Sequence, residues 1–244
     1  MTAVKKFITI GTMLWLLVAT PSSAEVIQVD SNFDGKMDQW QYVTQDRKIE
    51  KIEFDTNGDG KVDQVDFYDL NKTPIRVQLD TNFDGKMDQV QHYSRTGILQ
   101  MVERDSKSFG AFDLKEYYGP GTKLIRIEAD TNHDGKANAF QFFNEQEKVM
   151  RVEYDTDFNG KLDRWEYYSD ESKIESVAFD TNGDEKPEQW QFFSATGILE
   201  KVGFDMNNDG KPDSWKFYDP KGNLVRVEID SNFDGILDIV RNLQ

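Results

Sequence analysis

Residues 30–54 read DSNFDGKMDQWQYVTQDRKIEKIEF, and this pattern returns every 25 residues without an insertion. The period is marked by nine equally spaced aspartates: Asp30, Asp55, Asp80, Asp105, Asp130, Asp155, Asp180, Asp205 and Asp230. Each aspartate opens a nine-residue segment that approximates D-x-N-x-D-G-x-x-D, numbered here as loop positions 1 to 9. A period of this length is typical of stacked units that are each too small to bury an apolar face alone.

Two runs of alternating residues follow each segment. In the first repeat, Trp40 and Tyr42 flank Gln41, and Ile52 and Phe54 precede the next aspartate. An alternation with period two, rich in aromatic and β-branched residues, is typical of a half-buried strand. Between the two runs, three repeats carry a glycine suited to a positive φ: Gly97, Gly197 and Gly222. The unit is therefore predicted to be strand, tight turn, strand and aspartate loop.

These units predict an all-β repeat protein of nine 25-residue β-hairpin units. The simplest arrangement is an antiparallel meander that forms an open ribbon. A closed, propeller-like ring is the alternative, because large open sheets tend to curl or split. After residue 24 the chain begins with a strand of the second type and ends with one of the first type, residues 236–243, so the two ends could pair. The sequence leaves both arrangements open.

The first 24 residues are predicted to be a signal peptide. Lys5 and Lys6 precede an apolar run from Phe7 to Thr20, and small residues end at Ala24. The run is shorter than the ~20 residues that span a bilayer. We therefore expect cleavage near Ala24, a single repeat domain over residues 25–244, and no membrane span in the mature chain. The expected location is extracytoplasmic, either periplasmic or secreted.

Composition narrows the possible partners. The chain has 45 acidic and 29 basic residues, a net charge of −16, which argues against binding to nucleic acid. Its 13% aromatic content is too high for an ordinary disordered acidic chain. There is no cysteine, so an exported domain of this kind needs a cross-link other than a disulfide.

The spacing of the acidic residues predicts that this cross-link is calcium. Ca²⁺ binds six to eight hard oxygen ligands at about 2.3–2.6 Å. Side chains at loop positions 1, 3, 5 and 9, with the carbonyl of position 7, supply such oxygens, and glycine at position 6 permits the sharp bend. Aspartate, asparagine and glycine also make ordinary turns, but a turn does not need repelling carboxylates at positions 1, 5 and 9.

Seven loops follow the pattern closely. Their predicted side-chain ligands are Asp30, Asn32, Asp34 and Asp38; Asp55, Asn57, Asp59 and Asp63; Asp80, Asn82, Asp84 and Asp88; Asp130, Asn132, Asp134 and Asn138; Asp155, Asp157, Asn159 and Asp163; Asp205, Asn207, Asp209 and Asp213; and Asp230, Asn232, Asp234 and Asp238. Their predicted carbonyl ligands belong to Lys36, Lys61, Lys86, Lys136, Lys161, Lys211 and Ile236.

Two loops depart from the pattern. The seventh offers Asp180, Asn182, Asp184 and Glu188 but has Glu185 in place of glycine, so we expect a weaker site. The fourth has Lys107 and Phe109 at two ligand positions and is predicted to bind no metal. There we expect the Lys107 ammonium to replace the ion by bridging Asp105 and Asp113. The whole chain would then hold up to about eight Ca²⁺ ions.

The loops resemble the calcium loops of EF-hand proteins. EF-hands need flanking helices and a bidentate glutamate at position 12, where this chain has Gln41, Asp66, Gln91, Gln141, Glu166, Gln191, Lys216 and Arg241. The strand–loop–strand calcium hairpins of FG-GAP propeller blades, as in integrin α-chains, are more similar. The resemblance implies ligands at positions 1, 3, 5 and 9, the carbonyl of position 7, and no glutamate at position 12. Those blades are longer than 25 residues, so the resemblance covers the hairpin alone.

Three functions fit these features. The first is a calcium-stabilised structural or adhesion module whose partner is a protein, a polysaccharide or another copy of the chain. The second is an extracytoplasmic calcium buffer or sensor. The third, a carbohydrate-active enzyme, is disfavoured because nearly every aspartate is explained by its loop position and His92 and His133 occupy unrelated repeat positions. We predict no catalytic residue and no enzymatic activity.

Two further features could recruit a partner. The tryptophans Trp40, Trp165, Trp190 and Trp215 share one repeat position and form either part of an apolar core or, less simply, a sugar-stacking strip. The fourth repeat is irregular around Lys115 and Tyr118 and is a candidate binding patch.

Overall fold

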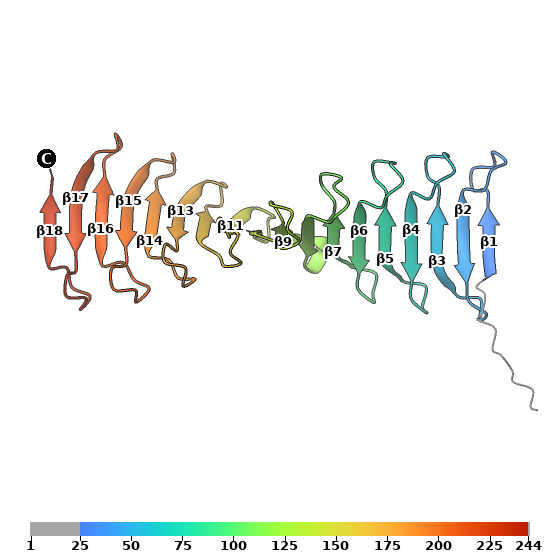
Figure 1. Ribbon diagram of the computed structural model, residues 1–244, viewed down its shortest axis with the longest axis horizontal. Coiled ribbons are helices and arrows are strands. Elements are labelled where there is room, and N and C mark those ends of the chain that lie inside the picture. The colour runs from blue at the N-terminus through green and yellow to red at the C-terminus, as the bar shows by residue number, and fades with distance from the viewer. Residues whose placement is uncertain (1–24, 244) are drawn as a thin grey trace, which may run out of the picture.

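A computed structural model describes residues 25–243 and contains one antiparallel sheet in which the strands follow one another in chain order. The strands are β1 (Glu25–Val29), β2 (Gln39–Val43), β3 (Ile49–Phe54), β4 (Gln64–Tyr68), β5 (Pro74–Leu79), β6 (Gln89–Tyr93), β7 (Leu99–Arg104), β8 (Leu114–Tyr118), β9 (Leu124–Ala129), β10 (Ala139–Phe143), β11 (Val149–Tyr154), β12 (Arg164–Tyr168), β13 (Ile174–Phe179), β14 (Gln189–Phe193), β15 (Leu199–Phe204), β16 (Ser214–Tyr218), β17 (Leu224–Ile229) and β18 (Ile239–Asn242). The predicted all-β meander of hairpin units is confirmed (Figure 1).

The ribbon is open. Within residues 25–243, β1 pairs with β2 alone and β18 pairs with β17 alone. The two end strands lie at opposite ends of the molecule (Figure 1). The closed, propeller-like ring is therefore wrong, because the twisting ribbon carries its end strands apart instead of curling them together.

Each tight hairpin contains a β-bulge. In the first, Tyr42 faces Lys51 and Val43 faces Ile49, so Glu50 is an extra residue in its strand. The same shift recurs in every other tight hairpin of the described chain. Bulges increase the right-handed twist of the strands that carry them. In Figure 1 the sheet accordingly turns, and it is seen edge-on near β9 and β11.

The meander sorts its connections onto two edges. Aspartate loops join odd-numbered strands to the next strand, and tight turns join even-numbered strands to the next, so the loops share one edge of the sheet. Because the ribbon twists, this edge lies at the top of Figure 1 near β1 to β8 and at the bottom near β17 and β18.

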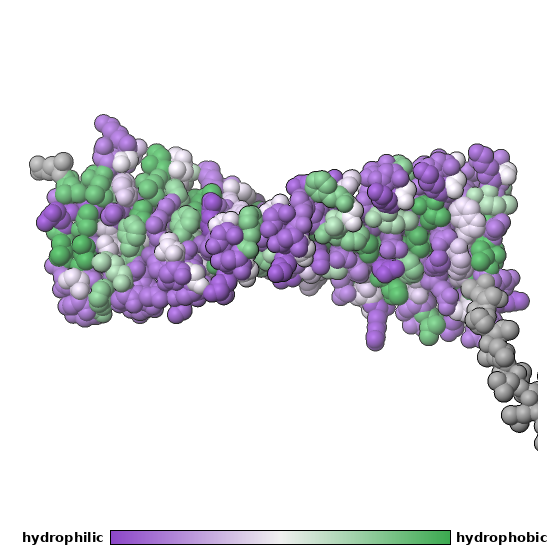
Figure 2. Space-filling view, in the orientation of Figure 1, coloured by the Kyte–Doolittle hydropathy of each residue, from purple (hydrophilic) through white to green (hydrophobic). Residues whose placement is uncertain are grey.

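The sheet is a single layer, and both of its faces meet solvent. One face carries a row of buried aliphatic residues at one repeat position: Ile52, Val77, Val102, Val152, Val177 and Val202. Successive residues of a strand point to opposite faces, so the tryptophans lie on the other face, where they are half-buried. No large side chain in the described chain is fully buried. Apolar and polar residues accordingly interleave over the surface (Figure 2).

Charged side chains complete the packing of the tryptophan-bearing face. The Arg126 guanidinium lies 4.2 Å from the centre of the Tyr117 ring and pairs with Glu128 at 2.8 Å. The Tyr117 hydroxyl in turn donates to Glu128 at 2.9 Å. Similar aromatic–cation pairs recur in other hairpins, for example Lys51 over Tyr42 at 4.1 Å. In a single layer, the stems of such long side chains cover apolar rings that a second layer would otherwise bury.

The tight turns confirm the predicted role of glycine. Gly97, Gly197 and Gly222 have φ values of 76°, 78° and 84°. Other residues occupy the same position in the remaining turns and also have a positive φ: Arg47, Lys72, Thr122, Glu147 and Ser172. Residues 25–243 contain no helix long and apolar enough to cross a membrane. The predicted signal peptide lies outside the described residues.

Candidate metal centre

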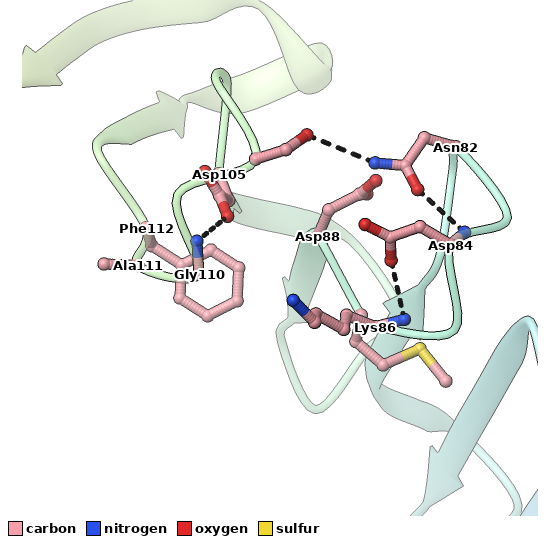
Figure 3. A pocket seen from close by; sticks show the side chains of 10 residues that line it. Asn82, Asp84, Lys86, Asp88, Asp105, Gly110, Ala111 and Phe112 are labelled. Carbon is pink, nitrogen blue, oxygen red and sulfur yellow. Dashed lines mark hydrogen bonds between the residues drawn. The ribbon is translucent and has the colours of Figure 1, made fainter.

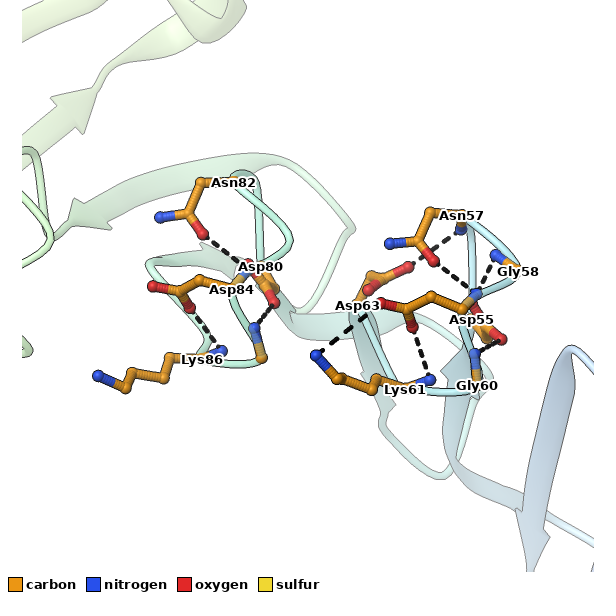
Figure 4. A network of polar contacts seen from close by, with 12 residues as sticks. Asp55, Asn57, Gly58, Gly60, Lys61, Asp63, Asp80, Asn82, Asp84 and Lys86 are labelled. Atoms are coloured by element: carbon orange, nitrogen blue, oxygen red, sulfur yellow. Dashed lines mark hydrogen bonds and ion pairs between the residues drawn. The ribbon is translucent and has the colours of Figure 1, made fainter.

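The aspartate at position 1 organises each loop. In the second loop, Asp55 Oδ2 accepts a hydrogen bond from Gly60 N at 2.8 Å, and its Oδ1 accepts from Gly58 N at 2.7 Å (Figure 4). The bond from the position 6 amide to the position 1 carboxylate recurs in every loop. Position 6 has a positive φ throughout, with Gly60 at 88°. The predicted bend at this position is therefore confirmed.

Positions 3 and 5 are held by the backbone two residues further on. Asn57 Oδ1 accepts from Asp59 N, and Asp59 Oδ1 accepts from Lys61 N, both at 2.8 Å. The third loop repeats this arrangement, and Figure 4 shows Asn82 and Asp84 extending to the same side of their loop. The amides thus fix the side-chain oxygens that the sequence predicts as ligands.

Position 9 has a partner that the motif does not include. Asp63 is 3% exposed, and its Oδ2 accepts from Thr56 N at 2.8 Å and from Thr56 Oγ1 at 2.9 Å. The predicted motif leaves position 2 unconstrained, although eight loops have a hydroxyl there: Ser31, Thr56, Thr81, Ser106, Thr131, Thr156, Thr181 and Ser231. The exception, Met206, offers only its backbone amide, at 2.8 Å from Asp213. The recurrence of Ser and Thr at position 2 is the feature of the sequence that indicates this contact with position 9.

At three of the loops these hydrogen bonds lower the pKa of the position 9 carboxylate and favour its charged form. The backbone N–H of Ser31 holds the pKa of Asp38 below its ordinary value. The side-chain hydroxyl of Ser231, and then its N–H, lowers the pKa of Asp238. Burial acts to raise the pKa of Asp113, but the bonds from Ser106 outweigh it and the pKa is lowered overall. These three carboxylates are thus anionic oxygen ligands at neutral pH.

The sixth loop gathers three carboxylates that can hold a metal ion. Oxygens of Asp155, Asp157 and Asp163 lie within 4.8 Å of one another. Two ligands on opposite sides of one calcium ion stand up to about 5 Å apart, so this spacing fits. Asp163 Oδ2 accepts from Thr156, but Asp163 Oδ1 is buried and has no hydrogen-bond partner. A buried, unpartnered carboxylate oxygen is costly unless a cation meets it.

The seventh loop brings together a second such group. Oxygens of Asp180, Asp184 and Glu188 lie within 4.8 Å of one another. Glu185 adopts a φ of 67° and its N–H donates to Asp180 at 2.7 Å, so the bend forms without glycine. Glu188 replaces the usual aspartate and still accepts from Thr181 N at 2.7 Å.

The remaining predicted ligands lie in loops of the same conformation. The first, second, third, fifth, eighth and ninth loops have an asparagine at position 3, as the seventh does with Asn182. The fifth loop also has Asn138 at position 9, where Oδ1 accepts from Thr131 N and Nδ2 donates to Thr131 Oγ1, both at 2.9 Å. Their predicted ligation of calcium stays a prediction.

The fourth loop keeps the bend but does not replace the ion with lysine. Lys107 Nζ lies 3.4 Å from His133 Nε2 in the next loop and not between Asp105 and Asp113. Asp105 accepts instead from Gly110 N at 2.6 Å, and Asp113 accepts from Ser106 N at 2.7 Å. The predicted bridge is wrong because the position 3 side chain extends toward the neighbouring loop.

A cavity of about 130 Å³ separates the third and fourth loops (Figure 3). Its lining includes the carboxylates of Asp84, Asp88 and Asp105, the Lys86 side chain and the Phe112 ring. The position 7 lysine thus lies among carboxylates of two successive loops. Elsewhere this lysine binds the next loop directly, since Lys161 Nζ donates to the Gly183 carbonyl at 2.7 Å.

The irregular fourth repeat engages its own side chains within the sheet. Lys115 Nζ lies 3.5 Å from Glu103, and the Tyr118 hydroxyl donates to Glu116 at 2.8 Å. Burial, followed by the bond to Glu116, raises the pKa of Tyr118 to about 12. A partner site at this patch stays a prediction.

No protein-family model and no curated protein matches the chain. A mutant form of S. aureus TarM, crystallised with Fondaparinux, alpha-GlcNAc-glycerol and UDP, is 15% identical with a TM-score of 0.35, over 45% of this chain and 20% of that chain. The GtfA/B complex bound to UDP and GlcNAc is 14% identical with a TM-score of 0.18, over 54% and 22%. TcdB2-TccC3-Cdc42 is 10% identical with a TM-score of 0.23, over 83% and 13%. The chain thus spans less than a quarter of each of these proteins.

Proposed function

We propose that this protein is an exported β-ribbon that binds Ca²⁺ along one edge and serves as a structural or adhesion module, not as an enzyme. The observation that carries the proposal is the sixth loop. There, three carboxylates converge, and Asp163 Oδ1 is buried without a hydrogen-bond partner. The same backbone conformation recurs in the other loops, which supports up to about eight ions.

The donor set favours calcium over other common ions. The predicted ligands are carboxylate, amide and carbonyl oxygens, whereas zinc prefers sulfur and nitrogen donors. A loop that supplies many oxygens suits the six to eight ligands of Ca²⁺. Mg²⁺ demands a smaller octahedral shell and retains its waters, so this loop suits it less well.

The position of the loops in the sheet supports a structural role. Each loop joins two paired strands, so a bound ion ties one hairpin to the next. Successive loops are separated by two strand spacings, about 10 Å, which is close to the Debye length of ~8 Å at physiological salt. The repulsion between acidic loops is then only partly screened, and bound ions would remove it.

Binding also contributes directly to the stability of the ribbon. A single site occupied at a hundredfold excess over its dissociation constant adds about 2.7 kcal/mol. The free energy added by several such sites together exceeds the free energy of local unfolding of the weakest segments of an ordinary domain. A protein, a polysaccharide or another copy of the chain remains the proposed partner of the calcium-loaded ribbon.

The test is a thermal melt of residues 25–244 monitored by far-UV circular dichroism, first in excess EDTA and then with calcium added back. We expect a cooperative loss of the β-sheet signal, with a melting temperature that rises strongly when calcium is added. Calorimetry should show about eight ions bound per chain. Magnesium at the same concentration serves as the control and is expected to stabilise far less. Calcium binding without a change in the melt would favour the buffer or sensor instead. The absence of any binding would overturn the proposal.

A further inference from the structure

Successive loops contact each other through position 4, which the motif leaves free. Ser108 Oγ accepts a hydrogen bond from Asn82 Nδ2 at 3.2 Å, and His133 Nε2 lies 3.4 Å from Lys107 Nζ. In both pairs, position 4 of one loop reaches back to position 3 of the preceding loop. Position 3 carries a predicted metal ligand in most loops, so its partner in the next loop can affect its placement.

Asn208 makes the most extensive contact of this kind. Its Nδ2 donates to Asp184 Oδ2 at 2.8 Å, and its Oδ1 accepts from Asn182 Nδ2 at 3.4 Å. One side chain of the eighth loop therefore binds the side chains at both position 3 and position 5 of the seventh loop. The bond from Asn208 is also the main cause that lowers the pKa of Asp184.

These bonds orient the ligand atoms of the seventh loop. Asn182 Nδ2 donates to Glu188 Oε1 at 2.8 Å as well as to Asn208, so its amide nitrogen is occupied. With the nitrogen so held, the amide oxygen is the atom that accepts from Asp184 N at 2.9 Å. Oxygen, and not nitrogen, is the atom that calcium requires. The seventh loop lacks the position 6 glycine, so outside support matters more there.

Asn208 is itself fixed by the eighth loop. Its N–H donates to Asp205 Oδ1 at 2.7 Å, and Asp205 is the position 1 residue of that loop. Anything that orders Asp205 also orders the backbone of Asn208, which has a φ of 63°. The side chain that supports the seventh loop therefore stands on a ligand of the eighth.

We infer that Asn208 is a positioning residue for the metal site of the seventh loop, and that the seventh and eighth loops bind Ca²⁺ as a coupled pair. The inference rests on the proposed function, since it concerns the same ions. An ion in the eighth loop fixes Asp205 and with it Asn208, which holds Asn182 and Asp184 in their ligating orientation. By linkage, the ion in the seventh loop strengthens binding in the eighth by the same factor.

The test is calorimetric calcium titration of the 25–244 chain and of Asn208→Gly. Glycine already occupies position 4 at Gly58 and Gly183, with φ values of 78° and 81°, so the loop conformation tolerates it. Loss of an outer-shell partner typically weakens a metal site by 10- to 100-fold. We expect the combined affinity of the seventh and eighth sites to fall by about tenfold, while the other sites keep their affinity.

Two further variants assign the loss of affinity to these two loops. Asp180→Asn removes the central ligand of the seventh loop, and in this background Asn208→Gly is expected to change no remaining affinity. Asp205→Asn, which disables the eighth loop, is expected to weaken the seventh as well. Phe233→Gly changes position 4 of the ninth loop and is the matched control, expected to leave the seventh loop unchanged.

The outcomes distinguish failure of calcium binding as a whole from failure of the Asn208 contact alone. A wild-type chain that binds no calcium overturns the proposed function together with this inference. If the wild type binds calcium and Asn208→Gly matches it, the inference alone fails. The inference also fails if the effect of Asn208→Gly persists in the Asp180→Asn background, because the residue would then act on its own loop.

Discussion

At the scale of single residues, each loop depends on backbone amides that bind carboxylates. Asp55 and its counterparts accept from the amide five residues on, and Asp63 and its counterparts accept from the position 2 residue. These bonds join protein groups only, so a mutation that removes one of them can be tested separately for its effect on the loop and on metal binding. The position 2 hydroxyl offers the cleanest separation, because it touches the ligand and is not itself a predicted ligand.

Thr156→Val tests the position 2 hydroxyl. Thr156 Oγ1 donates to Asp163 Oδ2 at 2.7 Å, and valine keeps the shape and the N–H bond while removing this donor. We expect the free energy of unfolding in EDTA to fall by about 1 kcal/mol and calcium affinity to fall with it. Met206→Thr, which adds the missing hydroxyl to the eighth loop, is the reciprocal control and should be stabilising. Urea denaturation measures the stability of the wild type and of both variants. Equal stability of these three proteins would contradict the role of the hydroxyl.

Glu185→Gly tests the strained bend of the seventh loop. Glu185 has a φ of 67°, a left-handed conformation that costs a residue with a Cβ atom about 1 kcal/mol or more. Glycine should raise stability by about 1 kcal/mol and tighten calcium binding in that loop. Gly210→Glu makes the opposite change in the eighth loop and should lower both quantities. A Glu185→Gly protein that melts at a lower temperature than the wild type would count against this reading.

At the scale of strands and hairpins, the sequence predicts most of what is observed. The alternation around Gln41 placed β2 correctly, and Gly97 marked the turn between β6 and β7. The sequence could not choose between ribbon and ring, because that choice depends on the twist that bulges such as Glu50 add at every hairpin. It also missed Asn208, since contacts between loops depend on how twist brings them together.

Gly203→Glu tests the packing of one hairpin face. Most repeats have glutamate at this position, namely Glu53, Glu103, Glu128, Glu153 and Glu228, so the change looks favourable from the sequence. A Cβ atom on Gly203 would lie 2.9 Å from the Trp215 ring and 3.1 Å from Pro212 Cβ. We expect the variant to lose about 1–3 kcal/mol of stability.

Gln78→Glu makes the matched change in the second repeat. Gln78 faces Val65 and Val90, neither of which places a tryptophan against it, so this variant should keep wild-type stability. Urea denaturation of both variants in the presence of calcium provides the measurement. If Gly203→Glu were as stable as Gln78→Glu, the close approach of Trp215 would not be limiting.

At the scale of the whole molecule, the ribbon is a one-dimensional array in which each hairpin contacts only its neighbours. The contacts between paired strands recur from one hairpin to the next, and within residues 25–243 no strand pairs with one distant in the chain. Stability in such an array is approximately a sum of unit and interface terms. The loss of a whole 25-residue period should therefore reduce the stability of the ribbon less than a change that shifts the register of the repeats.

Two deletions test this directly. Removing residues 130–154 takes out the fifth loop with β10 and β11, and joins β9 to the sixth loop in the register that the repeat requires. We expect a folded, shorter ribbon that binds one calcium ion fewer by calorimetry.

Removing only residues 130–143 takes out the loop and β10, which leaves β9 followed by a tight turn and β11. The later loops would then move to the opposite edge of the sheet, and each aliphatic row would be interrupted. The smaller deletion should therefore lower the melting temperature more than the larger one does. It should also disturb the shape of the ribbon more, as measured by the maximum dimension from small-angle scattering. If the two deletions behaved alike, the register of whole periods would not be what holds the ribbon together.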